Sequence, residues 1–363
     1  MSRRSRHSRP STASLRRASG TFGRTANGYA RSPDPDRCGG GVMDGVGRQW
    51  TAAVPVTPRR QWLRIFLGGL ALWLATVGAI LLTGNPTLLP TLVLLGSFLV
   101  PVTFVAWAFQ RRDTGEVTVS LVFGTFLAGG VLGVLASAVL ESYLLRPSVL
   151  LFLGVGLIEE AAKLAALALL TRHLAAKTVR DGMILGAAVG FGFSALESAG
   201  YAFIALFTVQ GLSVVQVVQT EILRGLVAPV GHGLWTAILG GVLFSASSRD
   251  HFVVGIRLLF AYLGVALLHA LWDAMHVIAL FLTLFLTGAR DNRVTLDGSL
   301  GEPTPTQGAL MPALEGLGMA VVAVVGVVWL VALWRSAQHG SGRPRTGWRV
   351  PTGSSSREAV LRP

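Results

Sequence analysis

Long, uninterrupted apolar stretches are the feature that most restricts how this chain of 363 residues can fold. From Leu63 onward they follow one another at lengths of roughly twenty residues, enough for a helix to cross a hydrocarbon core of about 30 Å. Eight stretches are present: residues 63–83, 87–109, 117–140, 149–170, 183–207, 223–246, 253–286 and 310–334. They predict an all-α, polytopic bundle of about eight transmembrane helices. The seventh stretch is longer than one span requires, so it is either a tilted helix or a helix followed by a re-entrant segment.

Composition divides the chain into a membrane domain between two basic tails. Residues 1–60 are rich in Ser, Arg, Gly and Pro and lack apolar periodicity, so we expect a disordered tail there. Residues 61–335 form the predicted membrane domain, and residues 336–363 form a second disordered tail. A hydrophobic fraction of 52% with only 13% charged residues excludes one or two soluble domains of this length.

The distribution of charge predicts the orientation in the cell membrane. Thirteen of the 29 Arg residues lie at or before Arg64, and six more lie at or beyond Arg335. Loops with Arg111 and Arg112, with Arg172, Lys177 and Arg180, and with Arg249 alternate with loops that carry fewer bases. Because Lys and Arg are retained on the cytoplasmic side, we expect both termini in the cytoplasm and anionic lipid at the basic tails. The tails lack interleaved aromatic residues, so we do not expect them to bind nucleic acid.

Four carboxylates interrupt the apolar stretches, where each charge costs roughly 2.5 to 3.5 kcal/mol to bury in lipid. They are accompanied by other ionisable side chains within the same stretches. The acids are Glu159, Glu160, Glu197 and Asp273, and their companions are Lys163, His232, His269 and His276. Such groups normally face a protein interior or a water-filled cavity, so they identify the candidate functional site.

Glu159 and Glu160 lie one turn before Lys163 in the fourth stretch, at i+4 and i+3 spacing. The two carboxylates diverge by about 100 degrees around a helix, so we expect one acid to pair with Lys163 and the other to face a different neighbour. Two interpretations remain open. The group is either a buried ion pair that fixes helix packing, or a split pair in which one carboxylate is structural and the other is a general base.

Glu197 follows Gly182, Gly186 and Gly190, which repeat every four residues along the fifth stretch. A stripe of small residues allows another helix to approach closely, so we expect these glycines to serve packing. Glu197 follows the stripe on the same predicted helix, so we expect it to lie in the packed region rather than in lipid. Packing alone does not require a carboxylate there, so a functional role is favoured for Glu197.

The histidines complete a predicted convergence of four helices. His269 and Asp273 share one face at i and i+4, which orients an imidazole or supplies two metal ligands, and His276 falls on the same side as a secondary candidate. At a rise of about 1.5 Å per residue, Glu159, Glu197 and His269 lie about 18 to 24 Å from the cytoplasmic ends of their helices. His232 lies at a similar depth, so we expect one shared polar site.

These motifs, taken in order, resemble those of the PrsW-type intramembrane proteases, a family related to the type II CAAX prenyl endopeptidases and the Abi proteins. The motifs are Glu159-Glu160-x-x-Lys163, Phe193-x-x-x-Glu197, Arg224 followed by Pro229 and His232, and His269-x-x-x-Asp273. Together they cover about residues 149–277. The resemblance implies hydrolysis of a peptide bond in a membrane-anchored protein, typically an anti-sigma factor.

The resemblance also implies roles for individual residues. By analogy with the CAAX enzymes, Glu159 would activate water, Glu160 and Lys163 would support it, and His269 with Asp273 would stabilise the oxyanion. Glu197 stands where those relatives carry a histidine. Family members are often regarded as metalloproteases, which makes Glu160, Glu197, His232 and His269 candidate ligands for a divalent metal such as zinc. No His-Glu-x-x-His helix is present, which counts against a metal, so both a metal centre and a metal-free centre remain open.

Two other functions use the same residues. Buried acids and histidines also form relays in proton-coupled or cation-coupled transporters, and in that case flux would depend on Glu197. They could also hold helices together in a noncatalytic membrane scaffold, in which Glu159→Gln would lower stability and leave function intact.

Overall fold

The computed structural model describes residues 60–340 apart from positions 113, 210, 248–250, 289–299 and 302. The predicted tails at residues 1–60 and 336–363 lie outside the described residues except for Arg60 and residues 336–340. The last five belong to the final helix. Arg249, which contributed to the predicted orientation, also lies outside them.

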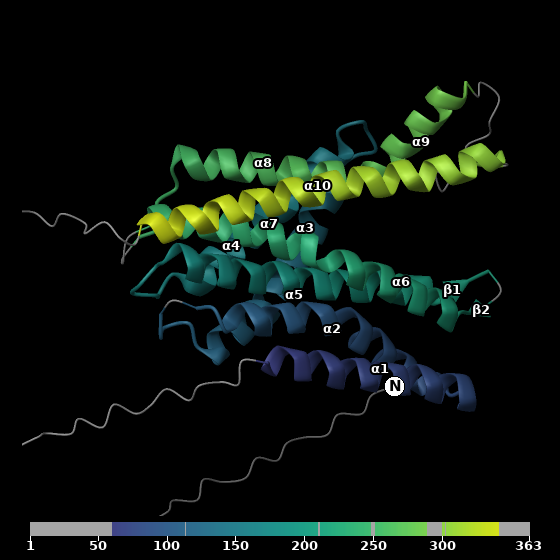
Figure 1. Ribbon diagram of the computed structural model, residues 1–363, viewed down its shortest axis with the longest axis horizontal. Helices are drawn as coiled ribbons and strands as arrows, with labels where there is room; N and C mark the ends of the chain where they lie inside the picture. The colour runs from purple at the N-terminus through teal and green to yellow at the C-terminus, as the bar shows by residue number, and fades with distance from the viewer. Residues whose placement is uncertain are drawn as a thin grey trace, which may run out of the picture. The chain divides into compact units, whose positions relative to one another are not determined.

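Helices make up nearly all of the described structure (Figure 1). The α-helices are α1 (Gln61–Thr83), α2 (Leu89–Phe109), α3 (Val119–Leu144), α4 (Leu151–Thr171), α5 (Val179–Ala205), α6 (Val214–Val227), α7 (His232–Ala246), α8 (Ile256–Asp273), α9 (Met275–Thr287) and α10 (Pro305–Gly340). Short 3₁₀ turns, η1 (Pro86–Leu88) and η2 (Ala228–Val230), precede α2 and α7. Strands β1 (Phe207–Thr208) and β2 (Gly211–Leu212) form a small antiparallel hairpin, in which Gly211 adopts a φ of 113° that favours glycine.

Seven helical segments of the described chain are long and apolar enough to cross a membrane. They are Gln61–Thr83, Pro86–Phe109, Val119–Leu144, Val179–Ala205, Val214–Ala246, Ile256–Asp273 and Pro305–Gln338. Helix α4 has 21 residues, a sufficient length, but Glu159, Glu160 and Lys163 interrupt its apolar sequence. The prediction of an all-α, polytopic membrane protein is confirmed.

Two of the predicted continuous spans are broken in the structure. The sixth was expected at residues 223–246 but begins earlier, at Val214. It is divided by η2 and Gly231 into α6 and α7. Pro229 lacks a backbone N–H and Gly231 has non-helical angles (φ −101°, ψ −132°), so the helix cannot continue through this turn. The seventh consists of two helices rather than one tilted helix, because α8 ends at Asp273 and α9 leaves in a different direction (Figure 1).

The close packing of α5 against α7 positions the polar site. A Cβ added to Gly186 would collide with the backbone of Thr236, and one added to Gly190 would collide with the backbone of His232. On α7, a Cβ added to Gly240 would meet the backbone of Gly182. The predicted packing role of the glycine stripe is therefore confirmed, and it brings α5 directly against the first turn of α7, where His232 lies.

Candidate active site

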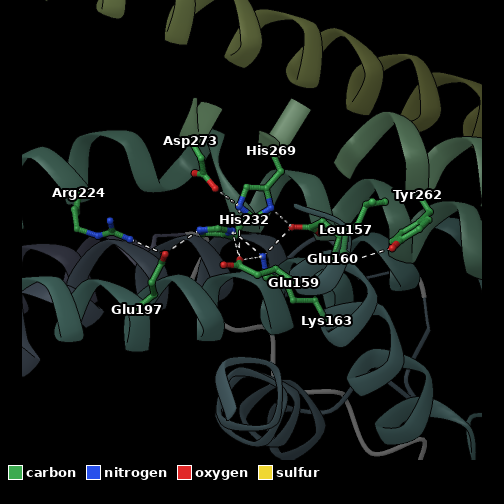
Figure 2. A network of polar contacts seen from close by, with 10 residues as sticks. All are labelled: Leu157, Glu159, Glu160, Lys163, Glu197, Arg224, His232, Tyr262, His269 and Asp273. Carbon is green, nitrogen blue, oxygen red and sulfur yellow. Dashed lines mark hydrogen bonds and ion pairs between the residues drawn. The ribbon is translucent and has the colours of Figure 1, made fainter. Parts of the chain in front are cut away.

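The charged residues of α4 form the buried centre of the polar cluster (Figure 2). Lys163 Nζ donates hydrogen bonds to Glu159 Oε2 at 3.0 Å and to Glu160 Oε1 at 2.8 Å. The expectation that only one acid pairs with Lys163 is wrong. The i+3 and i+4 positions both lie within reach of the long lysine side chain, so one ammonium group bonds both carboxylates.

Lys163 also connects α4 to α5 and α7. Its Nζ lies 2.8 Å from His232 Nδ1 and 3.9 Å from the centroid of the Phe193 ring. The ammonium group therefore has three polar neighbours and an aromatic face around it, which compensates for its complete burial. Phe193 belongs to the fifth-stretch motif, and its place in that motif is explained by this cation–π contact.

His269 joins the cluster from α8, with its ring centroid 4.9 Å from that of His232. Its Nδ1 lies 3.0 Å from Glu160 Oε1, and its Nε2 lies 3.3 Å from Asp273 Oδ2 and 3.6 Å from Glu159 Oε2. The predicted i, i+4 contact between His269 and Asp273 is present. The Trp235 ring lies against this imidazole, with centroids 4.7 Å apart, so carboxylates and an indole hold His269 in one orientation.

Glu197 of α5 supports His232 rather than Lys163. Its Oε2 lies 3.0 Å from His232 Nε2 and accepts a 2.6 Å hydrogen bond from Arg224. Arg224 also donates through Nε to Ser198 Oγ at 2.8 Å. His232 therefore has Lys163 at one ring nitrogen and a carboxylate at the other, and Arg224 fixes that carboxylate.

A polar pocket of about 70 Å³ lies against the cluster. It is lined by groups from α5, α6, η2, α7 and α8, among them Glu197, Tyr201, Arg224, His232 and Asp273. The pocket side of the cluster is the exposed side: the side chains of Asp273 and Glu197 are 29% and 24% exposed, Glu159 is 9% exposed and Glu160 is fully buried. Of the two α4 carboxylates, only Glu159 retains contact with the solvent-accessible side.

One predicted residue lies outside the cluster. His276 was expected on the same side as His269 and Asp273, but α8 ends at Asp273 and the chain changes direction before His276. His276 is 45% exposed and its Nδ1 lies 3.1 Å from Glu315 Oε2 on α10. The expectation assumed one continuous helix, and the break at Ala274 makes it wrong.

Several residues near the cluster were not expected from the sequence. Ser198, Tyr201 and Trp235 bond or pack against expected members, but serines and aromatic residues in a span give no distinct signal. Glu141, near the end of α3, interacts electrostatically with Glu159 and Lys163. It lies at the edge of an apolar stretch, where we expected a loop residue, so its proximity to the site could not be inferred.

Glu159, His232 and His269 could hold a metal ion among the described residues. One ligand atom from each lies within 4.8 Å of the other two. Glu159 Oε2 lies 3.6 Å from His269 Nε2 and 3.9 Å from His232 Nδ1, while the outer nitrogens of the two imidazoles contact Glu160 and Glu197. Two histidines and a glutamate, with carboxylates on the outer imidazole nitrogens, form a donor set suited to zinc. Glu160 and Glu197, expected as ligands, contact the outer nitrogens instead.

Residues 117–289 match the family model described as PrsW family intramembrane metalloprotease. This segment is a PrsW family protease domain. The predicted resemblance is thereby confirmed, and the domain contains every member of the polar cluster. The PrsW match begins at the N-terminal end of α3 and extends past α9, so α1, α2 and α10 lie outside it. Comparisons of the chain with curated proteins and with solved structures found no match.

The family match gives the cluster a chemical context. The chain is a protease with a multi-pass membrane domain, and a protease that works within the membrane implies a membrane protein as substrate. Its buried carboxylates and imidazoles therefore lie within the domain that defines the protease family.

Proposed function

We propose that the chain cleaves a peptide bond of a membrane-anchored protein at the cluster of Glu159, His232 and His269. One observation carries the proposal: ionisable side chains from α4, α7 and α8 converge beside a polar pocket inside a membrane domain. Burying these groups is costly, and packing could be achieved with apolar side chains. The family match favours proteolysis over the transport of a proton or cation.

Amide hydrolysis needs a base for water, a donor to the developing oxyanion and an acid for the leaving amine. We assign the base to Glu159, the α4 carboxylate on the accessible side. His269, oriented by Glu160 and Asp273, lies 3.6 Å from Glu159 and would donate to the oxyanion. The proton that Glu159 takes from water would pass by way of His269 Nε2, which lies 3.6 Å from Glu159 and 3.3 Å from Asp273, to the carboxylate of Asp273. Asp273, which lines the pocket, would then give that proton to the leaving amine.

The remaining polar residues are assigned positioning roles. Lys163 holds Glu159 and Glu160 in place through hydrogen bonds of 3.0 and 2.8 Å. Glu197 and Arg224 together orient His232. These assignments follow from which atom each residue contacts: Lys163, Glu197 and Arg224 bond the side chains of Glu159 and His232, whereas Glu159, His232 and His269 face one another.

A divalent metal such as zinc fits the same donor set, with Glu159, His232 and His269 as the residues that would hold it. When bound, the metal would polarise the carbonyl group and make water more acidic. Glu160 and Glu197 would then orient the two imidazoles through their outer nitrogens. Lys163 Nζ bonds Glu159 Oε2 at 3.0 Å and His232 Nδ1 at 2.8 Å, so a bound metal would have to take these two ligand atoms from the ammonium group.

We propose that the chain lies in the cell membrane with both termini in the cytoplasm. Arg111 at the end of α2 and Arg180 at the start of α5 lie near Trp107 and Trp334, respectively, and the basic loops agree with retention on the cytoplasmic side. A membrane-anchored anti-sigma factor is our proposed substrate, on the basis of the resemblance of the motifs.

The test is cleavage of candidate single-span proteins by the purified chain in lipid, with fragments mapped by mass spectrometry. Glu159→Gln should abolish cleavage while the protein remains monodisperse. Glu315→Gln is the matched control, because Glu315 lies on α10 and bonds only the exposed His276 among the described residues. Parallel reactions with a chelator distinguish a metal-dependent from a metal-free centre. Undiminished cleavage by Glu159→Gln would contradict the proposal.

A further inference from the structure

A second cavity, apolar and about 610 Å³ in volume, lies beside the active site, and we call it the groove. Its walls come from α2, α5, α7 and α10, so two of the four lie outside the PrsW match. The cavity and the polar pocket share one turn of the chain. Ala228 and Gly231 line the polar pocket, whereas Pro229 and Val230 line the apolar groove. The η2 turn therefore separates the groove from the site that contains His232.

The groove is short and its two ends differ in chemistry. Along α5 its lining runs from Met183 to Phe191, a separation of eight residue steps, which corresponds to about 12 Å of helix. One end carries Trp107, Arg111 and Trp334, and the other end is formed by apolar residues beside η2. Half of a hydrocarbon core measures about 15 Å, so the groove matches one leaflet.

Basic groups lie at the tryptophan end of the groove. The Arg111 guanidinium lies 3.7 Å from the centroid of the Trp107 ring, and Arg180 lies 4.5 Å from that of Trp334. Both tryptophan side chains line the groove, so both arginines flank its entrance. Tryptophan marks the depth of the lipid headgroups, and basic pockets between transmembrane helices bind anionic headgroups.

We propose that the groove binds an anionic phospholipid, with an acyl chain between α2 and α10 and its headgroup beside Arg111 and Arg180. An acyl chain runs from the headgroups to the bilayer centre, as the groove does. A transmembrane helix of a substrate must follow the full core of about 30 Å and has a diameter of about 10 Å, so most of it would not fit in this volume. The positive charge at only one end also favours a molecule with a single anionic head.

Lipid in this groove would contact the turn that precedes the reactive His232. The acyl chain would end against Pro229 and Val230, whose neighbours Ala228 and Gly231 form part of the polar pocket. The bound chain would thereby limit movement of η2. The lipid site stands independently of the proposed proteolysis, since it is defined by the groove and its basic entrance.

Native mass spectrometry of the full chain, titrated with phosphatidylglycerol or with zwitterionic phosphatidylcholine, tests the site. We expect tighter binding of phosphatidylglycerol. Arg111→Glu should weaken that binding by roughly five- to thirtyfold. Loss of one positive charge near the headgroup lowers the affinity roughly fivefold, and the added negative charge lowers it by a similar factor again. Arg64→Glu, a substitution of an exposed arginine on α1 outside the groove, is the matched control and should leave binding unchanged.

Filling the groove provides a second, charge-independent test. Val327→Trp on α10 should prevent binding of phosphatidylglycerol, whereas Val324→Trp, at an exposed position outside the groove, should not. Equal affinity for both lipids with no effect of Arg111→Glu would overturn the proposal. It would also be overturned if Val327→Trp blocked capture of a single-span substrate and left lipid binding intact, which would make the groove a docking site for a helix.

Discussion

Replacing Lys163 with methionine is the most direct test of how the polar cluster is held together. The substitution keeps most of the side chain's length and removes only the ammonium group. Glu159, Glu160 and His232 would each lose a hydrogen bond of 2.8 to 3.0 Å, and two carboxylates one residue apart on α4 would lose their shared cation. Lys163 and Glu160 are fully buried, so water cannot compensate for the loss.

The expected loss of stability is about 3–5 kcal/mol, the cost of removing one partner from a buried ion pair. Little of this cost comes from packing, because methionine fills most of the volume of the lysine stem. The figure corresponds to a fall in the unfolding temperature of roughly 6–20 °C, using about 2–4 °C per kcal/mol for a domain of 150–250 residues.

Thermal unfolding of the purified protein in detergent, followed by size-exclusion chromatography of heated samples, measures this shift. Lys177→Met is the matched control, because Lys177 is the chain's only other lysine and lies outside the cluster. It should unfold within about 1 kcal/mol of the unmodified protein, because Lys177 Nζ donates a hydrogen bond to the Leu174 carbonyl oxygen and bonds neither α4 carboxylate. If Lys163→Met unfolds no more than about 2 °C below the unmodified protein, the ammonium group does not neutralise the α4 carboxylates and the proposed support role is wrong.

Two further substitutions separate positioning from stability. Glu197→Gln should reduce cleavage about 10- to 100-fold, because it weakens the contact that orients His232 Nε2. Ser198→Ala removes only the hydrogen bond from Arg224 to Ser198, so it should reduce cleavage less. That difference would show that the carboxylate of Glu197 matters more than the bond to Ser198. Unchanged cleavage by Glu197→Gln would exclude this role. Trp73→Phe should lower the free energy of unfolding by about 1–3 kcal/mol, because Trp73 Nε1 donates a 2.7 Å hydrogen bond to the buried Glu221. Thermal unfolding checks it, and an unchanged unfolding temperature would contradict the expected cost of leaving Glu221 unpaired.

The membrane fold is accessible from the sequence because lipid imposes a simple requirement of apolarity and length on each span. The interruptions are not accessible in the same way. The short η2 turn and Gly231 divide α6 from α7, and the chain bends at Ala274 without a proline or glycine. The start of α6 was hidden for another reason. Its first turns carry Gln216, Gln219 and Glu221, which lower the local hydropathy and made the segment resemble an outer loop.

The composition of the site was predictable to the extent that it follows from the cost of burying charge. Glu159, Glu197, His232 and His269 are all conspicuous in apolar stretches, and their depths along the helices indicated a common level. Which atoms contact one another depends on the rotation of each helix about its axis, which periodicity fixes only coarsely. The sequence favoured Glu160 as a candidate metal ligand, whereas the structure places Glu159 in that position. The two residues differ by a rotation of about 100 degrees around α4.

The charge balance of the cluster links its structure to metal dependence. Among the residues drawn in Figure 2 there are four carboxylates, Glu159, Glu160, Glu197 and Asp273, and two permanent cations, Lys163 and Arg224. With all four carboxylates ionised and both imidazoles neutral, the buried network carries a net charge of −2, which a low-dielectric interior disfavours. A divalent metal removes this excess and leaves the imidazoles neutral, as metal ligands must be. Without a metal, a protonated His269 removes half of this excess, because both of its ring nitrogens face carboxylates, whereas His232 Nδ1 accepts from the Lys163 ammonium group and cannot also carry a proton. His269 could then act only as a donor, which leaves Glu159 as the base. Chelation therefore distinguishes two protonation states of the same cluster as well as two classes of protease. If cleavage survives chelation, the base must be a carboxylate, and Glu159→Gln should then be as inactive as the doubly substituted Glu159→Gln/Glu160→Gln protein.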